Sequence, residues 1–291
     1  MNRLDLYPQV RNLRLTSSKV VEGIYSGNYR SVFKGPGLEF DEVREYSPTD
    51  DSRFIDWNVT SRLGTPYTKI FREERELQLQ MVVDLSPSLY AGNGPMSKRD
   101  ILNILFANLT FAAVSNNDKV GAIFHTDRIE GWVGPRKGRN HATRLIQDCL
   151  TLDTQGQGSD LSLALRTVHE SMKHRGIIII LSDFRTTGYW QELSILSRKH
   201  DIICLMITDP LDDYFPRTGW LELQDPETGQ VLHAFGESSN FQQVYHDKWT
   251  LHKLHWRREC RRRGIETLEV STVDDPAARL VAFFNRRKAR R

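Results

Sequence analysis

Residues 79–88 read LQMVVDLSPS, and this stretch decides the fold. The run from Leu79 to Asp84 is short and apolar and is followed by a polar loop, which is typical of a buried β-strand. Beyond the loop, Ser97 and Asp100 have the spacing of a capping box and predict a helix over 97–114. A strand, a loop and a helix in this order form the first unit of an α/β domain.

The same alternation continues toward the C-terminus. The run GIIIIL at 176–181 is an uninterrupted β-branched stretch, which predicts a central parallel strand buried on both faces. Strands are also predicted at 119–126, 129–133, 202–208 and 266–270, and helices at 140–150, 161–174, 189–199, 240–263 and 276–287. The predicted fold class is therefore α/β, with a doubly wound, mostly parallel sheet of Rossmann type flanked by helices.

Residues 1–77 do not show this alternation of strand and helix patterns. They are polar and rich in turns, with breaks at 35–37 and 47–51, and the segments 38–46 and 67–71 are predicted to pair as strands. We therefore expect an N-terminal β-rich extension at 1–77, packed on a domain at 78–291. A turn-forming run at 225–229 predicts a small hairpin insertion in that domain, at about 218–236.

Composition excludes several classes of protein. With 39% apolar and 26% charged residues, a chain of 291 residues buries a core without disulfides. The net charge of +3 does not fit a polycation that coats nucleic acid. The three cysteines are far apart, which favours a reducing compartment. No signal-peptide core and no bilayer-spanning run is found, so we expect a cytoplasmic protein without a membrane segment.

Oxygen-bearing side chains follow the predicted strands. Asp84, Ser86 and Ser88 form a D-x-S-x-S run at the end of the first core strand, and the segments 158–161 and 181–183 reach the same sheet edge. Carboxylates and hydroxyls are hard ligands that suit Mg²⁺ or Mn²⁺ rather than zinc. The sequence therefore predicts an oxygen-rich cation site at this edge.

This pattern resembles the metal-ion-dependent adhesion site of von Willebrand factor A domains. In that family the second loop usually offers threonine, and here Ser159 keeps the hydroxyl, with the adjacent Asp160 as the alternative ligand. The resemblance implies that Mg²⁺ or Mn²⁺ is held by Asp84, Ser86, Ser88, Ser159 and Asp183. A carboxylate from another protein would complete the shell of the cation.

Motifs of the N-terminal segment, taken together with the site pattern, resemble the domain-of-unknown-function 58 family over roughly residues 25–290. They are Gly35-x-Gly37-Leu38-Glu39-Phe40, Arg44-Glu45-Tyr46, Asp50-Asp51-x-Arg53-x-Ile55-Asp56-Trp57, Arg62 and Phe71-Arg72-Glu73-Glu74-Arg75. The resemblance implies a von Willebrand A-like domain that works as a non-enzymatic adaptor or co-chaperone. Its implied partners are a MoxR-type AAA+ ATPase and an unknown protein client.

Other interpretations compete with this one. A magnesium-dependent phosphohydrolase would use the same aspartates, with Asp84 as nucleophile, but Ser86 stands where a second carboxylate is wanted. The basic runs at 257–263 and 286–291 are expected to be solvated helix faces, and no nucleic acid is expected. The motif at 169–174 has one residue too many for a zinc protease, and His252 and His255 are expected on a polar helix surface.

The N-terminal segment contains many opposite charges. They form either a buried network or a docking surface, and the cost of burying unpaired charge favours the network. On that hypothesis Arg53→Ala or Asp56→Ala lowers stability more than metal binding. The residues are Glu39, Arg44, Asp50, Asp51, Arg53, Asp56, Arg62, Glu73 and Arg75.

Overall fold

The structure is a computed structural model that describes residues 39–72, 77–90, 92, 96–215, 217–224 and 230–290. The described residues before Leu77 form one compact unit, and those from Leu77 onward form a second. Each unit is described by itself.

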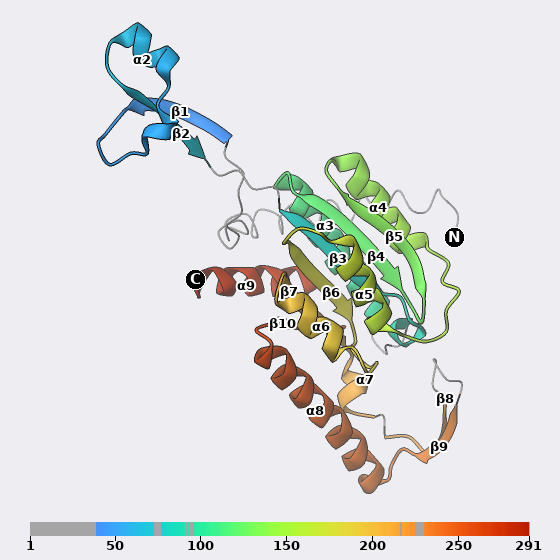
Figure 1. Cartoon of the computed structure of the whole chain (residues 1–291). Coiled ribbons are helices and arrows are strands. Elements are labelled where there is room, and N and C mark those ends of the chain that lie inside the picture. Colours follow the sequence, from blue (N-terminus) through green and yellow to red (C-terminus); the bar gives the residue numbers. More distant parts are fainter. Residues whose placement is uncertain are drawn as a thin grey trace. The chain divides into compact units, whose positions relative to one another are not determined.

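The second unit is built on a six-stranded sheet in the order β10-β7-β6-β3-β4-β5 (Figure 1). All neighbours are parallel except β5, which runs antiparallel to β4 at one edge. The bounds are β3 (Gln78–Asp84), β4 (Lys119–His125), β5 (Ile129–Arg136), β6 (Ile177–Ser182), β7 (Asp201–Thr208) and β10 (Glu266–Ser271). This mostly parallel, doubly wound sheet confirms the fold class predicted from the sequence.

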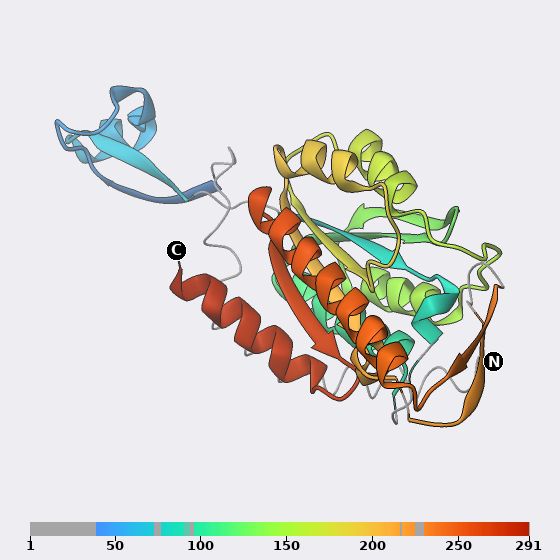
Figure 2. The same ribbon diagram turned by 90° about the horizontal axis from the view of Figure 1, so that it is seen from below.

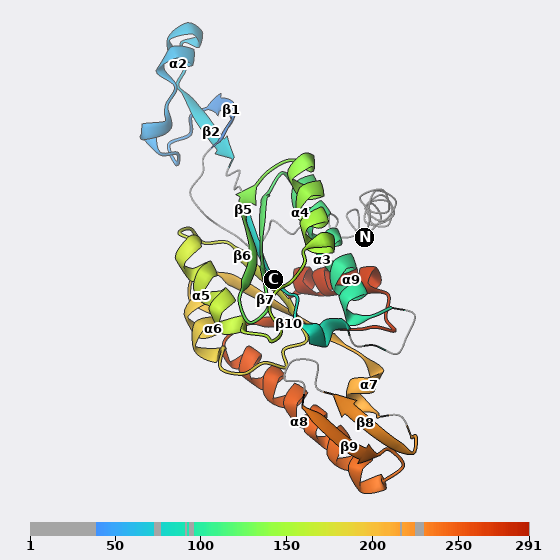
Figure 3. The ribbon, with the colours of Figure 1, turned by 90° about the vertical axis from the view of Figure 1, so that its right-hand side faces the viewer.

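Helices cover both faces of the sheet (Figure 3). One face carries α3 (Lys98–Ser115), α4 (Arg139–Thr151) and α9 (Pro276–Ala289), and the other carries α5 (Leu161–Ser171), α6 (Trp190–Ser197) and α8 (Ser239–Arg262). Figure 2 shows α8 and α9 on either side of the edge strand β10. Two short helices, η3 (Pro87–Tyr90) and α7 (Pro210–Asp213), follow β3 and β7 and were not predicted.

The core lies on both sides of the sheet. Every residue of β6 is buried, as its β-branched run predicts for a central strand. On the face of α5, α6 and α8, Trp256 is fully buried and its ring centroid lies 5.0 Å from that of Phe184. The long helix α8 is therefore anchored to the sheet through its C-terminal half.

Local signals in the sequence account for most helix ends. Ser97 and Asp100 form the expected capping box of α3, and α8 ends before Gly264, which has φ of +69°. The helix predicted over 161–174 is shorter, since α5 ends at Ser171. Met172 leaves helical geometry there and buries its side chain in the core.

The switch in strand order falls between β3 and β6. From β3 the chain continues through α3 and β4 to one side, whereas β6, reached through α5 on the opposite face, lies on the other side. The region between the loops that follow β3 and β6, at the carboxyl ends of the strands, is therefore where a ligand crevice is expected in such a fold.

A two-stranded hairpin lies between α7 and α8. β8 (Trp220–Gln224) pairs antiparallel with β9 (Val231–Phe235), and the predicted turn at 225–229 lies outside the described residues. Within the described part of the chain, no helix is both long and apolar enough to cross a membrane.

In the first unit, β1 (Glu39–Glu45) pairs antiparallel with β2 (Tyr67–Arg72), as predicted. Between them lie η2 (Ser52–Phe54) and α2 (Trp57–Leu63), which were not predicted. Asp56 is the N-cap of α2, and its carboxylate accepts from the N–H groups of Asn58 and Val59.

Within residues 39–72 the opposite charges form local pairs, and burial of a charge network against the rest of the chain stays a prediction. Arg53 pairs only with its near neighbour Asp51, and its side chain is 82% exposed. Arg44 is likewise half-exposed in its pair with Asp50. These are local surface pairs, because short turns bring the partners together without burying them. Glu73 and Arg75 lie outside the described residues.

Candidate functional site

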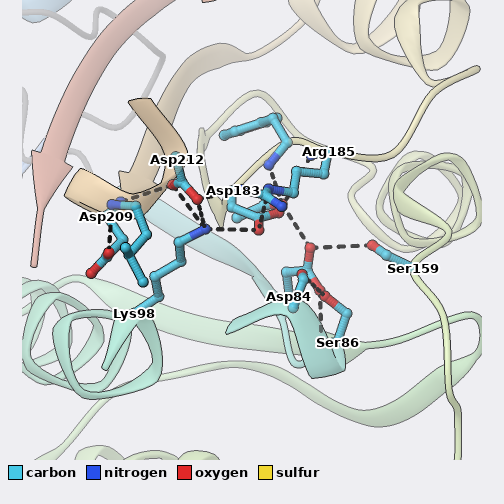
Figure 4. A network of polar contacts seen from close by, with 12 residues as sticks. Asp84, Ser86, Lys98, Ser159, Asp183, Arg185, Asp209 and Asp212 are labelled. Carbon is cyan, nitrogen blue, oxygen red and sulfur yellow. Dashed lines mark hydrogen bonds and ion pairs between the residues drawn. The ribbon is translucent and has the colours of Figure 1, made fainter. Parts of the chain in front are cut away.

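Asp84 belongs to a network of polar contacts in this crevice region (Figure 4). It is the last residue of β3 and is 1% exposed. Its Oδ1 accepts from the backbone N–H of Ser86 at 2.9 Å, and its Oδ2 accepts from Ser182 Oγ at 2.6 Å and Ser159 Oγ at 3.2 Å. Ser86 Oγ lies 3.1 Å from Ser88 Oγ. Asp84 therefore accepts from one backbone N–H in its own loop and from two hydroxyl groups, one in the loop before α5 and one at the end of β6.

Ser159 reaches Asp84 because its loop is held at two places. Glu130 Oε1 accepts from the backbone N–H groups of Gln155 and Gly156, at 3.0 and 2.7 Å. Thr186 Oγ1 donates to the carbonyl of Ser159 at 2.9 Å. The residue after Ser159 instead caps helix α5.

That next residue is Asp160, the N-cap of α5. Its Oδ1 accepts from the N–H of Leu163 at 3.0 Å and from Ser162 Oγ at 2.6 Å. Of the two alternatives that the sequence left open, Ser159 is the one that contacts Asp84.

Asp183 follows β6 and is 1% exposed. The residue after it, Phe184, has φ of +54°, an uncommon conformation for a bulky side chain. The N–H of Phe184 donates to Ser182 Oγ at 2.9 Å, and its ring is fully buried. This fixed turn places Ser182 on Asp84 and Asp183 beside it, and such strained positions are concentrated at functional sites.

Two cations that the sequence analysis missed lie next to Asp183. Lys98 is fully buried at the start of α3, and its Nζ lies 3.5 Å from Asp183 Oδ2 and 2.9 Å from Asp212 Oδ2. Arg185 pairs with the same two carboxylates, and its Nε lies 3.4 Å from Asp183 Oδ2. Asp212 belongs to α7, directly after β7, so a third strand end contributes to the crevice.

The acidic groups of the crevice outnumber its cations. Asp84, Asp183 and Asp212 face Lys98 and Arg185, which leaves one uncompensated negative charge in this group. Burial raises the pKa of Asp183, the nearby Asp84 raises it further, and Lys98 and Arg185 act in the opposite direction. A bound cation would remove the repulsion between Asp84 and Asp183.

The donor set fits a hard cation rather than zinc. Among the described residues, no three His, Cys, Asp or Glu side chains gather in a way that could hold a metal. A cation beside Asp84 and Asp183 would therefore take hydroxyl and water oxygens for the rest of its shell, which suits Mg²⁺ or Mn²⁺. The residues to supply them are Ser86, Ser88 and Ser159, the first two 0% and 5% exposed.

The other motifs of the sequence contribute no metal ligands. His174 lies beyond the end of α5, so it does not share a helix with His169. His252 was expected on a polar surface, but it is half-buried and stacks on Trp249 with ring centroids 5.0 Å apart. A single sequence gives no sign of that packing.

Several arginines of the basic runs are engaged within the protein. Arg257 pairs with Glu269, and Arg263 Nη1 lies 2.6 Å from Glu259 Oε2. Arg287 is 7% exposed and pairs with Asp201 and, at 3.0 Å, with Glu266. Arg287 therefore differs from the expectation of a solvated face, because its ion pairs tie α9 to the sheet.

Comparison with known proteins places the chain in a family. The model of the family described as "Protein of unknown function DUF58" matches residues 42–254. The chain belongs to the DUF58 family. This DUF58 chain is 29% identical over 282 residues to the uncharacterized proteins Rv1480 of Mycobacterium tuberculosis and Mb1516 of Mycobacterium bovis. The match covers 96% of this chain and 89% of each of theirs.

Two solved structures are similar at low identity. One is an aerotolerance-related membrane protein from Bacteroides fragilis, with a TM-score of 0.48 and 15% identity over 74% of this chain and 100% of that one. The other is the SpRpn10 VWA domain, with a TM-score of 0.40 and 11% identity over 71% and 94% of the two chains. Both scores are low, so the fold assignment of the DUF58 chain rests on its strand order.

Proposed function

We propose that this DUF58 protein is a non-enzymatic protein-interaction module that binds partners through a divalent cation. Mg²⁺ or Mn²⁺ would be held in the crevice by Asp84, Ser86, Ser88, Ser159 and Asp183. The observation that carries the proposal is that the buried Asp84 accepts from the Ser86 N–H and from the hydroxyls of Ser159 and Ser182, beside a second buried carboxylate.

The chemistry of the donors defines what the cation would do. The positive charges of Lys98 and Arg185 offset part of the negative charge of Asp84 and Asp183, so these two carboxylates neutralise a divalent ion only in part. Hydroxyls and water, which complete the shell, are exchangeable ligands. An acidic side chain of another protein would replace water in the shell. The chain's own residues hold and orient the ion, and none of them is assigned a role in turnover.

The partners belong to the proposal as well. The resemblance of the sequence motifs favours a MoxR-type AAA+ ATPase and a protein client, acting in assembly or maturation of other proteins in the cytoplasm. No nucleic acid is proposed, because Arg257, Arg263 and Arg287 are engaged in ion pairs within the protein.

The first experiment measures Mn²⁺ binding by isothermal titration calorimetry for wild-type protein, Asp84→Ala and Asp160→Ala. Asp84→Ala should abolish binding because it removes the central carboxylate. Asp160→Ala should keep it, because Asp160 caps a helix and does not contact Asp84. Equal binding by all three proteins would contradict the proposed ligand set.

The second experiment is a pull-down from native cytosol with wild-type and Asp84→Ala protein, each in Mg²⁺ and in EDTA. An AAA+ ATPase or client retained only by wild-type protein in Mg²⁺ would support the proposal. Hydrolysis of p-nitrophenyl phosphate by wild-type protein, lost in Asp84→Asn, would overturn it in favour of a phosphohydrolase.

A further inference from the structure

A pocket of about 380 Å³ adjoins the crevice, on the side of α8. One wall is a stripe of residues on a single face of this helix, and the opposite wall comes from the loop after β6 and from α7. The lining residues are Phe241, Tyr245, Lys248, Trp249 and His252 from α8, with Arg185 and Asp212 opposite. Its volume is that of a small-ligand or side-chain site.

The crevice and the pocket share Arg185. Its Nε lies 3.4 Å from Asp183 Oδ2, and its guanidinium carbon lies 5.0 Å from the centroid of the Trp249 ring. Asp212 also belongs to both, since it pairs with Lys98 in the crevice and lines the pocket. A segment bound in the crevice therefore has the pocket within one or two residues of its carboxylate, at the rise of an extended chain.

Aromatic rings form much of the pocket. Phe241 and Tyr245 have ring centroids 6.1 Å apart, and both rings contact Phe215 edge to face, at 5.5 and 5.3 Å. Trp249 is 8% exposed, and its indole N–H has no hydrogen-bond partner among the described residues. Such walls suit another aromatic ring.

The charges of the pocket favour an acidic partner. Lys248 is exposed, and no ion pair of its side chain is found in the part of the chain that the structure describes. Asp212 is the one acidic residue among those that line the pocket, and it is paired with Lys98 and Arg185. A segment that carries negative charge next to an aromatic side chain is complementary to this surface.

We infer that the pocket is a specificity site for an aromatic side chain that lies one or two residues from the partner's metal-bound carboxylate. The inference rests on the proposed function for the position of the carboxylate. The occupant is an acidic, aromatic peptide segment of another protein.

The probes are five labelled peptides of Gly and Ser, each with one central Asp. Four of them carry Phe at position −2, −1, +1 or +2 from the Asp, and the fifth carries Ala in its place. Affinity is measured by fluorescence anisotropy in Mg²⁺ and in EDTA. At least one Phe peptide should bind wild-type protein about tenfold or more tightly than the Ala peptide, as expected for an aromatic anchor in a pocket.

Variants of α8 test the location. Phe241→Ala removes a pocket wall and should abolish the preference for Phe, whereas Val244→Ala, at a residue that is 59% exposed and outside the pocket, should keep it. Lys248→Glu, at an exposed residue, should weaken binding of the preferred peptide. The same reversal at Arg261, an exposed residue further along α8, should leave binding unchanged.

The outcomes separate the two proposals. Magnesium-dependent binding of all five peptides with equal affinity would overturn the pocket and keep the metal site. A preference for Phe that survives EDTA and Asp→Asn in the peptide would keep the pocket and overturn the metal site. Absence of binding by every peptide would overturn the inference.

Discussion

Replacement of Lys98 by methionine tests the electrostatics of the crevice. The side chain is fully buried, and its ammonium lies between Asp183 and Asp212. Met keeps most of the aliphatic stem and removes the charge. Without metal, the two buried carboxylates then share only Arg185, and we expect a loss of about 3–5 kcal/mol in the free energy of unfolding.

The same substitution should strengthen metal binding. An Mg²⁺ ion about 2.1 Å from Asp183 Oδ2 would lie within about 5.6 Å of Lys98 Nζ, because Nζ is 3.5 Å from that oxygen. At that distance, repulsion between a divalent ion and the ammonium is about 1.5 kcal/mol even at the dielectric constant of water. Removal of the ammonium should therefore lower the dissociation constant about tenfold or more.

Calorimetric titration with Mn²⁺ and urea unfolding followed by tryptophan fluorescence measure both effects. Lys173→Met is the control, because this exposed lysine lies near the start of β6, at the end of the strand opposite to Asp183. Lys98→Met protein with a native circular dichroism spectrum, and with Mn²⁺ affinity equal to or weaker than that of wild type, would refute this reasoning.

Three further predictions concern other parts of the chain. Burial lowers the pKa of His200 to about 4, so the contribution of His200 to stability is constant above its unfolded pKa near 6.5 and falls by about 3 kcal/mol as the pH drops toward 4. His200→Asn should remove this contribution and reduce the loss of stability that urea unfolding measures between pH 7 and pH 4.5. Gly156→Ala should lower the free energy of unfolding in urea by about 1–3 kcal/mol and weaken Mn²⁺ binding, because the added Cβ would lie 2.0 Å from Thr126 Oγ1. Gly158→Ala should be neutral, because its added Cβ would lie 3.6 Å from the nearest atom. Asp56→Ala should lower the free energy of unfolding by about 1 kcal/mol through loss of the α2 cap, and Arg53→Ala should lower it by less than about 0.5 kcal/mol. Equal losses of stability in thermal melts of the two variants would contradict the surface position of Arg53.

Most of the fold follows from local signals in the sequence. The apolar runs at 79–84 and 176–181 predict strands, and the parallel order brings their carboxyl ends together at the switch point. That rule alone places Asp84 and Asp183 side by side. The four-residue helix α7 was not predicted, because Pro210–Asp213 is too short for a periodic pattern.

The missed part of the site depends on tertiary structure. Lys98 occupies an ordinary first-turn position, and its burial results from the approach of Asp183 and Asp212, which are distant in sequence. Ser182 reads as the last residue of a strand, and only the turn at Phe184 directs it to Asp84. The α8 pocket was missed because its aromatic and charged residues read as a mixed polar helix.

The division of α8 into two halves has a consequence for protein engineering. Trp256 and Cys260 in the C-terminal half belong to the buried cluster, whereas the pocket residues lie between Phe241 and His252. Residues 239–252 can therefore be treated as a cassette. Exchange of this cassette between homologues would transfer partner preference while the anchor that holds the helix to the sheet stays constant.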